Sequence, residues 1–194
     1  MKFEIFKFKS VTSTNDVAIN LIKEKQKISG CVHADKQTKG RGTHGKNWVS
    51  EKGNLFVSLF FPLNKNFPTF NEFATINPII ISNVIKKLSN DKKITLKFPN
   101  DVFLNKKKIC GLLQELITLK ERKFLIIGIG INIIKDPKIK EKYQSTSIFM
   151  ETNTKPSVTK VVDLIISSYE NFFIELSSYK YENYIKSAET LSLI

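Results

Sequence analysis

Apolar residues recur with two different periods along this chain, and the two periods predict strands and helices in different regions. In seven segments separated by polar turns, apolar residues alternate with polar ones or form short buried runs. The predicted strands are residues 2–8, 30–36, 54–63, 94–98, 101–105, 108–119 and 123–134. The last four follow one another with turns of only a few residues, so we expect them to pair antiparallel.

Helical spacing of the apolar residues predicts three helical regions. The first covers residues 12–25 and the second covers 70–90. The third runs from Val158 to about Lys186 and is predicted as one long amphipathic helix, or as that helix followed by a second. Pro78 lies in the second region and is expected to kink or end that helix. Strands in the middle and helices at the flanks predict an α+β fold with a mixed, mainly antiparallel sheet, rather than repeated βαβ units.

The length and composition fit one domain. Of the 194 residues 41% are hydrophobic, and no linker divides them, so residues 1–194 are expected to form a single domain. Cys31 and Cys110 lack Cys-x-x-Cys spacing and the N-terminus lacks a hydrophobic signal sequence, which favours a reduced, cytoplasmic protein. The longest charge-free apolar stretch, residues 124–134, is shorter than the about 20 residues of a spanning helix, so membrane insertion is not expected.

The chain is strongly basic. It carries 31 Lys and Arg against 18 Asp and Glu, and a net charge of +13 would attract nucleic acid or acidic partners. The lysines are dispersed, however, apart from the run at residues 106–108. Dispersed lysine is typical of a solvated surface, so the charge alone does not indicate a nucleic-acid site.

Residues 40–45, GRGTHG, match the Gly-x-Gly-x-x-Gly pattern of dinucleotide-binding loops. Such a loop needs a strand before the glycines, a helix directly after them and an acidic residue about 20 positions further on. Strand-like sequence follows Gly45 instead, and no Asp or Glu lies between Glu51 and Glu72. A second near-match at residues 128–133 lacks the third glycine. We therefore do not expect a Rossmann-type dinucleotide site.

The same loop has the composition of an anion-binding site. Its glycines allow the backbone to approach a ligand closely, and its basic side chains are Lys39, Arg41, His44 and Lys46. Arg41 and Arg122 are the only arginines in the chain, so Arg41 indicates a bidentate contact with a phosphate or a carboxylate. The alternative is a flexible hairpin tip whose arginine has no ligand.

Five stretches form an ordered set: TSTND (12–16), QTKGRGTHGKNW (37–48), KFPND (97–101), KKKICGLLQE (106–115) and GIGIN (128–132). Together they resemble the motifs of the biotin protein ligases, and the resemblance extends over nearly the whole chain. It implies the biotin/lipoate ligase catalytic fold. It also implies an enzyme that uses ATP and Mg²⁺ to convert biotin to biotinyl-5′-AMP, and then transfers the biotinyl group to a lysine of a biotin carboxyl carrier protein of acetyl-CoA carboxylase or a related carboxylase.

The resemblance assigns one group of residues to biotin. Residues 13–15 would lie at the ureido end of biotin, and a helix N-cap is their alternative role. Gln37 and the backbone of residues 41–43 would line the biotin and acyl-phosphate side. The implied biotin-binding residues are Ser13, Thr14, Asn15, Gln37, Arg41, Gly42, Thr43, Lys108 and Gly111.

A second group is implied in ATP binding and catalysis. Lys108 would polarise the biotin carboxylate, Arg41 would lie close to the phosphate, and Asp101 would also help to deprotonate the incoming amine. Trp48 would cover the adenine or anchor the closed loop, with core packing as its alternative. The implied ATP- and phosphate-binding residues are Gly40, Arg41, His44, Lys46, Trp48, Asn100, Asp101 and Asn132. Asp101 and Asn132 are the candidate Mg²⁺ ligands, although without the resemblance both would fit ordinary turns.

The chain departs from the family pattern in the loop and at both ends. Family loops commonly read Gly-Arg-Gly-Arg-x-Gly-Arg, whereas Thr43 and Lys46 replace the second and last arginines, so we expect biotinyl-5′-AMP to leak more readily. We expect neither the N-terminal helix-turn-helix nor the C-terminal SH3-like barrel of many relatives, so that the protein would be a minimal or a shortened ligase. DNA repression is therefore not expected, and ATP affinity and carrier recognition would be affected. Residues 39–47 are expected to be a mobile loop that orders over the ligand.

Two other functions stay open as alternatives. Lipoate or octanoate ligases and transferases share the fold, but their glycine loop typically reads Arg-Arg-x-Ser/Thr-Gly-Gly-Gly. A non-enzymatic nucleic-acid-binding module would need a basic face interleaved with exposed aromatic residues, whereas most of the 15 Phe here fall at core positions. The sequence leaves open which carrier is modified and whether a homodimer forms through exposed strand edges.

Overall fold

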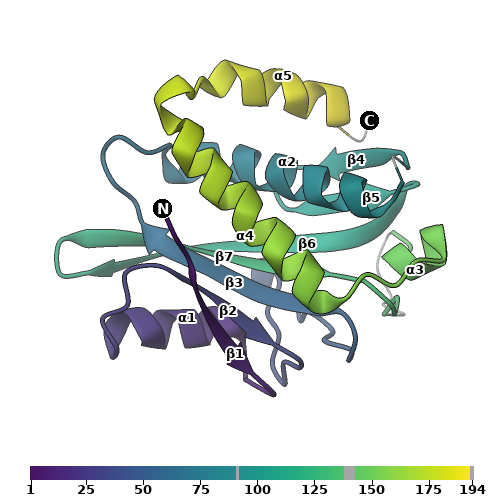
Figure 1. The fold of residues 1–194 in the computed structure, drawn as a ribbon, viewed down its shortest axis with the longest axis horizontal. Coiled ribbons are helices and arrows are strands. Elements are labelled where there is room, and N and C mark those ends of the chain that lie inside the picture. The colour runs from purple at the N-terminus through teal and green to yellow at the C-terminus, as the bar shows by residue number, and fades with distance from the viewer. Residues whose placement is uncertain (91, 138–142, 193–194) are drawn as a thin grey trace.

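The computed structural model describes residues 1–90, 92–137 and 143–192, which form one sheet with helices on both faces (Figure 1). The strands are β1 (Glu4–Phe8), β2 (Gly30–Ala34), β3 (Leu55–Pro62), β4 (Ile94–Lys97), β5 (Asp101–Leu104), β6 (Lys107–Leu119) and β7 (Arg122–Ile131). Their order in the sheet is β1-β2-β3-β7-β6-β5-β4. The β1–β2 pair is parallel and the other neighbouring pairs are antiparallel, which confirms the predicted α+β fold with its mixed, mainly antiparallel sheet.

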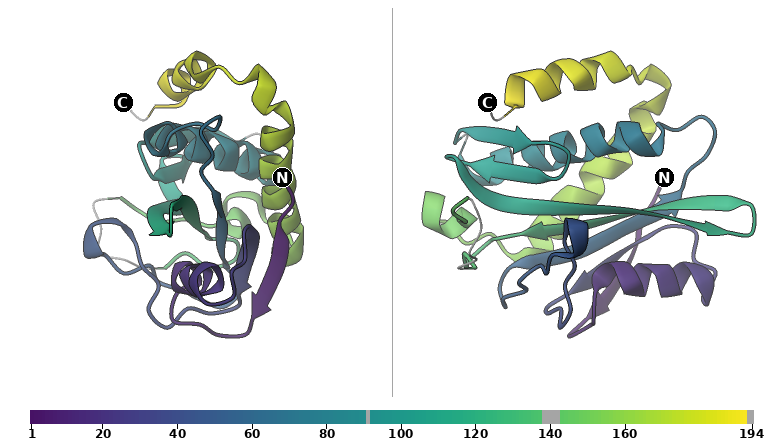
Figure 2. Two further views of the ribbon diagram at one scale, coloured as in Figure 1. Left: turned by 90° about the vertical axis from the view of Figure 1, so that its left-hand side faces the viewer. Right: turned by 180° about the vertical axis from the view of Figure 1, so that it is seen from behind.

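Helices cover the two faces of the sheet unequally. The helices are α1 (Thr14–Lys23), α2 (Phe70–Leu88), α3 (Ile148–Thr152), α4 (Val158–Ile174) and α5 (Tyr181–Leu191), with 3-10 turns η1 (Thr43–Gly45) and η2 (Glu175–Ser178). α1 packs on one face, whereas α2 and α4 pack on the other and α5 lies outside α2 (Figures 1 and 2). The predicted tail helix is thus two helices joined by η2. The short α3 was not predicted, because five residues are too few to establish a helical period.

Pro78 lies inside helix α2, so of the two expected effects, a kink or a helix end, the helix end is wrong. A capping box fixes the start of α2, where the Thr69 side chain accepts from the backbone N–H of Glu72 and the Glu72 carboxylate accepts from the backbone N–H of Thr69. Proline removes one backbone hydrogen bond, but the helix buries a long run of side chains on both sides of Pro78. That burial maintains the helix through the proline.

Each sheet face carries its own apolar cluster, because side chains alternate along the strands. On β7, Leu125, Ile127 and Ile129 belong to the large core under α2 and α4, whereas Phe124 and Ile126 belong to the small cluster under α1. On the α1 side, the next residues that would continue this alternation are Gly128 and Gly130 rather than bulky side chains. The apolar packing under α1 therefore stops at this point, and it leaves an open space on the sheet.

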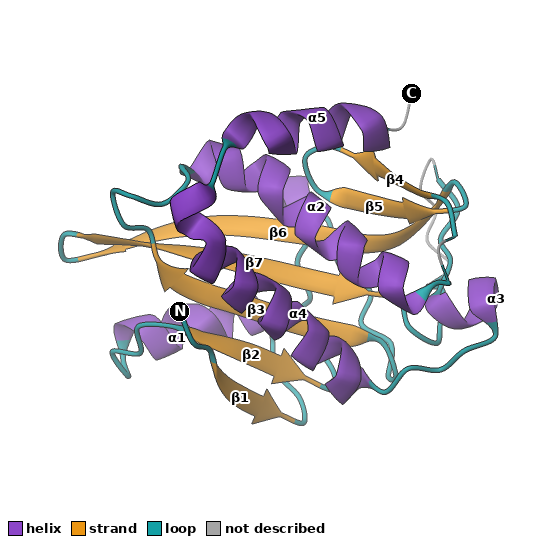
Figure 3. Ribbon diagram, turned by 45° about the horizontal axis from the view of Figure 1, so that its top comes forward, coloured by secondary structure: helices purple, strands orange, loops and turns teal. Residues whose placement is uncertain are grey.

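The longest strands are β6 and β7, and their hairpin extends beyond the neighbouring strands (Figure 3). The opposite ends of these strands carry Gly111 and Gly130, which pair with each other across the β6–β7 ladder. Within the described ranges, none of the helices combines the length and the apolar character that crossing a membrane requires.

Candidate active site

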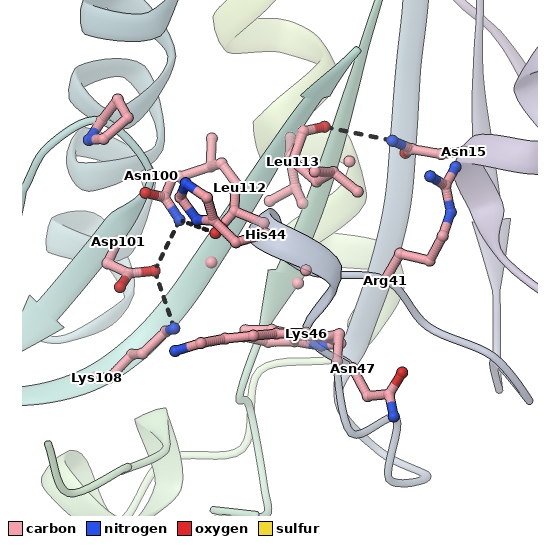
Figure 4. Close-up of a pocket in the computed structure, with 18 of the residues that line it drawn as sticks. Asn15, Arg41, His44, Lys46, Asn47, Asn100, Asp101, Lys108, Leu112 and Leu113 are labelled. Atoms are coloured by element: carbon pink, nitrogen blue, oxygen red, sulfur yellow. Dashed lines mark hydrogen bonds and ion pairs between the residues drawn. The ribbon is translucent and has the colours of Figure 1, made fainter. Parts of the chain in front are cut away.

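A cavity of about 470 Å³ lies on the α1 side of the sheet, where β7 carries its two glycines (Figure 4). Its walls come from the start of α1, the glycine loop, the turn before β5, and strands β6 and β7. All but two of the residues that the sequence assigned to biotin, ATP or catalysis line this cavity. They are Ser13, Thr14, Asn15, Gln37, Arg41, Gly42, Thr43, His44, Lys46, Trp48, Asn100, Asp101, Lys108 and Gly111.

Three glycines form the floor of the cavity. A Cβ atom at Gly111 or Gly130 would overlap the indole ring of Trp48, and one at Gly128 would overlap the side-chain amide of Asn15. At these three positions the sheet has no side chains, and Trp48 and Asn15 pack directly against its backbone. The sequence analysis missed Gly128 and Gly130 as site residues, although two glycines at a strand period of two were a usable signal.

A network of small polar side chains forms one end of the cavity, which we call the polar end (residues 13–15 and Gln37, supported from behind by Ser58). The backbone N–H and the hydroxyl of Thr14 donate to Oε1 of Gln37 at 2.8 and 3.1 Å. The hydroxyl of Ser58 lies 2.7 Å from Oγ1 of Thr14 and also contacts Oδ1 of Asn15. Ser58 is fully buried on β3 and was not predicted, because in the sequence it is one residue of a buried strand.

Ser13, the N-cap residue of α1, makes no side-chain capping hydrogen bond. It is nevertheless buried and lines the cavity. Ser13 therefore occupies the predicted N-cap position, but its side chain lines the cavity instead of capping the helix.

Arg41 makes a two-pronged contact with a carboxylate, but that carboxylate belongs to the protein. Its Nη1 and Nη2 donate to the two oxygens of Glu115, each at 2.8 Å, and Nη2 also donates to Asp16 at 2.7 Å. The hydrogen bonds with Glu115 are the main reason that the pKa of Arg41 is raised, so the guanidinium stays charged. Neither Glu115 nor Asp16 was predicted as a site residue.

Lys108 lies at the other end of the cavity, which we call the lysine end (Lys108, Asp101 and Asn100). Its Nζ is 3.0 Å from Oδ1 of Asp101 and 5.6 Å from the centre of the Trp48 ring. Asn100 donates to Oδ1 of Asp101 at 3.4 Å and to the hydroxyl of Thr43 at 3.3 Å, so the loop tip touches this end (Figure 4). The lysine and the carboxylate are both largely shielded from solvent.

Cys110 is the thiol nearest to Lys108 in the sequence, but it is not available for catalysis. It is fully buried, and burial raises the pKa of its thiol far above the ordinary range. A buried neutral thiol is a poor nucleophile.

The glycine loop is folded across the cavity. Gly42 donates its N–H to the carbonyl of Lys46 at 2.7 Å, and Trp48 donates to the carbonyl of Gly40 at 2.8 Å. His44 and Gly45 adopt left-handed backbone angles, with φ of 55° and 72°, to complete this tight turn. The chain then runs into β3 without an intervening α-helix, so a pyrophosphate has no helix N-terminus here.

Two predicted residues lie outside the cavity wall. Gly40 is buried against the carbonyl of Trp48, so its role is to let the two sides of the loop approach. The Asn132 amide donates to the carbonyl of Thr146 at 3.0 Å and accepts from Asn54 at 3.4 Å. These hydrogen bonds hold the segments after β7 together, and the role of Asn132 as a phosphate or Mg²⁺ ligand stays a prediction.

The residues around Asp101 do not form a metal site of their own. In the described part of the chain, no three His, Cys, Asp or Glu side chains gather closely enough to hold an ion. Asp101 is ion-paired with Lys108, and Asn132 is used internally. A nucleotide-bound Mg²⁺ would thus depend on the phosphates for most of its ligands.

Lys97 and Tyr143 also line the cavity, beside the lysine end, and they were not predicted as site residues. Nζ of Lys97 lies 4.6 Å from the centre of the Tyr143 ring, and both side chains line the cavity. Tyr143 follows β7 in a loop without a recognisable pattern, so only the folded chain brings it to the site.

The sequence matches known proteins over much of its length. The model of the Biotin/lipoate A/B protein ligase family matches residues 7–132. The bifunctional ligase/repressor BirA of Escherichia coli is 33% identical over 125 residues, which are 63% of this chain and 38% of that protein. Biotin–protein ligase 2 of Arabidopsis thaliana is 32% identical over 136 residues, with the same two shares. The matched part of the chain therefore spans less than half the length of these relatives.

Solved structures extend the similarity to the whole fold. The biotin protein ligase of Aquifex aeolicus in complex with biotin and ATP is 27% identical, with a TM-score of 0.80, and the match covers 98% of this chain and 78% of that one. The biotin protein ligase of Leishmania major in complex with biotinyl-5-AMP is 26% identical, with a TM-score of 0.84, and the match covers 98% of this chain and 81% of that one.

Proposed function

Because the chain belongs to the biotin/lipoate A/B protein ligase family, we propose that it activates biotin with ATP and transfers the biotinyl group to a lysine of a biotin carboxyl carrier protein. One observation carries this proposal. A single cavity has a polar end of hydroxyl and amide groups and a lysine end with Lys108, and a glycine floor connects the two. Biotin has the same arrangement, with a ureido ring at one end and a carboxylate at the other.

The polar end suits a ureido ring, which offers one carbonyl acceptor and two N–H donors. The hydroxyl of Ser13 can donate to the carbonyl, and Oδ1 of Asn15 can accept from an N–H. Both side chains are almost fully buried, so the ring would be desolvated and its hydrogen bonds would discriminate strongly against rings without them.

At the lysine end, the ammonium of Lys108 would stabilise negative charge on the biotin carboxylate and on the phosphate that it attacks. A carboxylate oxygen forms a bond with the α-phosphorus of ATP while pyrophosphate leaves, and this step needs no nucleophile from the protein. A carrier lysine amine then attacks the acyl carbon and AMP leaves. Asp101, 3.0 Å from Lys108, is placed to accept the proton that the amine loses.

Further positive charge for the phosphates would come from the loop and from β4, through Lys46 and Lys97, and His44 also lines the cavity. Mg²⁺ would neutralise the triphosphate. Since the described residues form no metal cluster, no step is assigned to a metal held by the protein. The proposal treats residues 1–194 as one catalytic domain.

A lipoate or octanoate substrate fits the same cavity less well. The dithiolane ring of lipoate and the chain of octanoate lack hydrogen-bonding groups, so they would leave the buried polar groups of Ser13 and Asn15 without ligand partners. The polar end thus favours biotin within this family.

The test is to incubate the protein with ATP, Mg²⁺ and either biotin or lipoate, and to measure pyrophosphate release and adenylate formation. Release with biotin alone, followed by transfer to a purified biotin carboxyl carrier domain, is the expected result. Release with lipoate alone would assign the chain to the other branch of the family. If neither acid gave pyrophosphate release or an adenylate, the proposed activation step would be refuted.

A further inference from the structure

Glu115 lies where the glycine loop meets the polar end, and it contacts both. Its two oxygens accept from Nη1 and Nη2 of Arg41, each at 2.8 Å, and one of them also accepts from Nδ2 of Asn15 at 2.6 Å. Arg41 and Asn15 come from segments far apart in the sequence, yet their side chains lie next to each other in the cavity (Figure 4). Glu115 is therefore the shared partner of the loop and of the ring-binding residues.

The charges around Arg41 indicate that it links the loop to the rest of the protein and does not bind a phosphate. Its guanidinium is paired with the carboxylates of both Glu115 and Asp16. One positive and two negative charges leave this cluster with a net negative charge, which would not attract a phosphate. The bidentate geometry instead fixes the base of the loop against β6 and α1.

Glu115 also determines which way the Asn15 amide faces. A carboxylate only accepts hydrogen bonds, and the carbonyl of Leu113 at 3.3 Å does the same, so the NH₂ group of Asn15 must face these two acceptors. The amide oxygen then points toward Ser58 and Gly128. In this orientation Asn15 offers a ligand an acceptor and not a donor.

We propose that Glu115 is a positioning residue that holds the glycine loop closed through Arg41 and fixes Asn15 as a hydrogen-bond acceptor, so that the polar end prefers a ring with N–H donors. The identity of that ring as biotin rests on the proposed function. The closed loop and the oriented amide do not, since both are contacts of the protein alone.

The variant that tests this is Glu115→Gln, which keeps the size of the side chain, removes its charge and adds a donor. The Gln amide can satisfy only one nitrogen of Arg41 and no longer dictates the orientation of Asn15. In the ligand-free protein we expect the hydrogen-bonded amides of Lys39, Gly42, Lys46 and Trp48 to exchange about tenfold faster than in the wild type. In the enzyme assay, KM for biotin should rise about tenfold while kcat and KM for ATP change less than about twofold.

A coupling test and a matched control support the assignment. Arg41→Lys cannot make the bidentate contact and should speed exchange in the loop similarly, and the double variant should be no worse than the more severe single one. Glu121→Gln removes a carboxylate from the exposed turn of the same hairpin and should leave loop exchange and biotin KM unchanged.

The possible results separate the two proposals. Unchanged loop exchange in Glu115→Gln would overturn the positioning role whatever the substrate is. Faster loop exchange in Glu115→Gln, together with no biotin-dependent pyrophosphate release by the wild type, would support the positioning role of Glu115 and refute the proposed function. A parallel fall of kcat for all substrates, with an unchanged biotin KM, would also overturn the role of Glu115 at the polar end.

Discussion

Gly130 lies directly beneath the indole of Trp48, and this contact explains why a bulky residue is missing from a strand that is otherwise rich in isoleucine. A Cβ at this position would overlap the ring atoms around Nε1. That nitrogen is buried and has no hydrogen-bond partner among the described residues. The indole is therefore held by its close packing on the glycines and by the cation–π contact with Lys108, and not by a hydrogen bond of its nitrogen.

The first prediction concerns this contact. Gly130→Ala should displace the indole and destabilise the protein by about 1–3 kcal/mol, the usual cost of an added methyl group in a packed site. Thermal unfolding monitored by Trp48 fluorescence measures both effects, because Trp48 is the only tryptophan in the chain. Gly42→Ala is the control, since the nearest atom to its added Cβ lies at an ordinary 3.4 Å. Equal melting temperatures for Gly130→Ala and the wild type would contradict the close packing.

The second prediction concerns Lys108. Lys108→Ala removes the ammonium from the lysine end and leaves Asp101 without its ion-pair partner. We expect biotin-dependent pyrophosphate release to fall about a hundredfold or more, as when a preorganised electrostatic contact is lost. Lys106→Asn is a matched control, because it removes a lysine from the adjacent turn and suits the left-handed φ of 66° at that position. A wild-type rate for Lys108→Ala would remove Lys108 from the mechanism.

At the scale of elements, the base and the tip of the glycine loop are attached to the site by contacts of different strength. Its base is tied through Arg41 to Glu115 and Asp16, and its tip touches Asn100 through the hydroxyl of Thr43 at 3.3 Å. The tip contact is a neutral, partly buried hydrogen bond, without the charges that strengthen the contact at the base. Such a bond contributes only about 1 kcal/mol, so the tip is the weaker of the two attachments.

The third prediction follows from this weak tip. Thr43→Arg would add a cation beside the adenylate phosphate, and we expect the release of biotinyl-5′-AMP to slow about tenfold. The measurement is a trapping experiment in which labelled adenylate is formed on the protein and its loss into excess unlabelled biotin and ATP is followed. Thr43→Val, which removes the hydroxyl without adding charge, separates the loss of the Asn100 contact from the gain of a cation. Release as fast as in the wild type would show that position 43 does not retain the intermediate.

The sequence predicted the elements well where a period was long enough. All seven strands appear at the expected places, whereas the five-residue α3 and the 3-10 turns η1 and η2 went unrecognised among the described elements. The prediction that Pro78 could end α2 was wrong, because the loss of one backbone hydrogen bond was weighed without the burial along the rest of the helix.

Only part of the candidate site was predicted from the sequence. Residues within the five motifs lie together, because those motifs end strands or begin a helix at one side of the sheet. Ser58 lies outside the motifs, and the motif that ends at Glu115 does not reveal the role of that residue. Their roles depend on which residues of β3, β6 and β7 stand opposite one another, and strand register is set by the folded sheet.

At the scale of the whole molecule, the two faces of the sheet differ in what they bury. Under α2 and α4 a continuous apolar core stabilises the fold, whereas the α1 side divides into a small apolar cluster and the cavity. Variants in the cavity should therefore affect ligand binding more than stability, and variants in the large core should do the reverse. The glycine floor is the exception, because there the ligand cavity and the packing of Trp48 share the same atoms.

The stability of the whole molecule should depend on pH through His33 of β2. Burial lowers its pKa below the ordinary value, and Nε2 is buried without a partner among the described residues. The unfolded chain takes up this proton at about pH 6.5, before the folded chain does, so stability must fall as the pH drops below that value. Carboxylates contribute little in this window, because they titrate about two pH units lower.

The fourth prediction is therefore a lower urea midpoint at about pH 5.5 than at about pH 7.5, with the difference reduced in His33→Gln. The only other histidine, His44, lies exposed at the loop tip, so His44→Asn should keep the full difference while preserving the left-handed backbone there. If His33→Gln retained the whole pH dependence, the acid sensitivity would have to come from groups other than the buried histidine. If the wild type showed no difference, the histidine would be protonated in the folded protein and its burial would be compensated by Asp35, the one neighbour that raises its pKa.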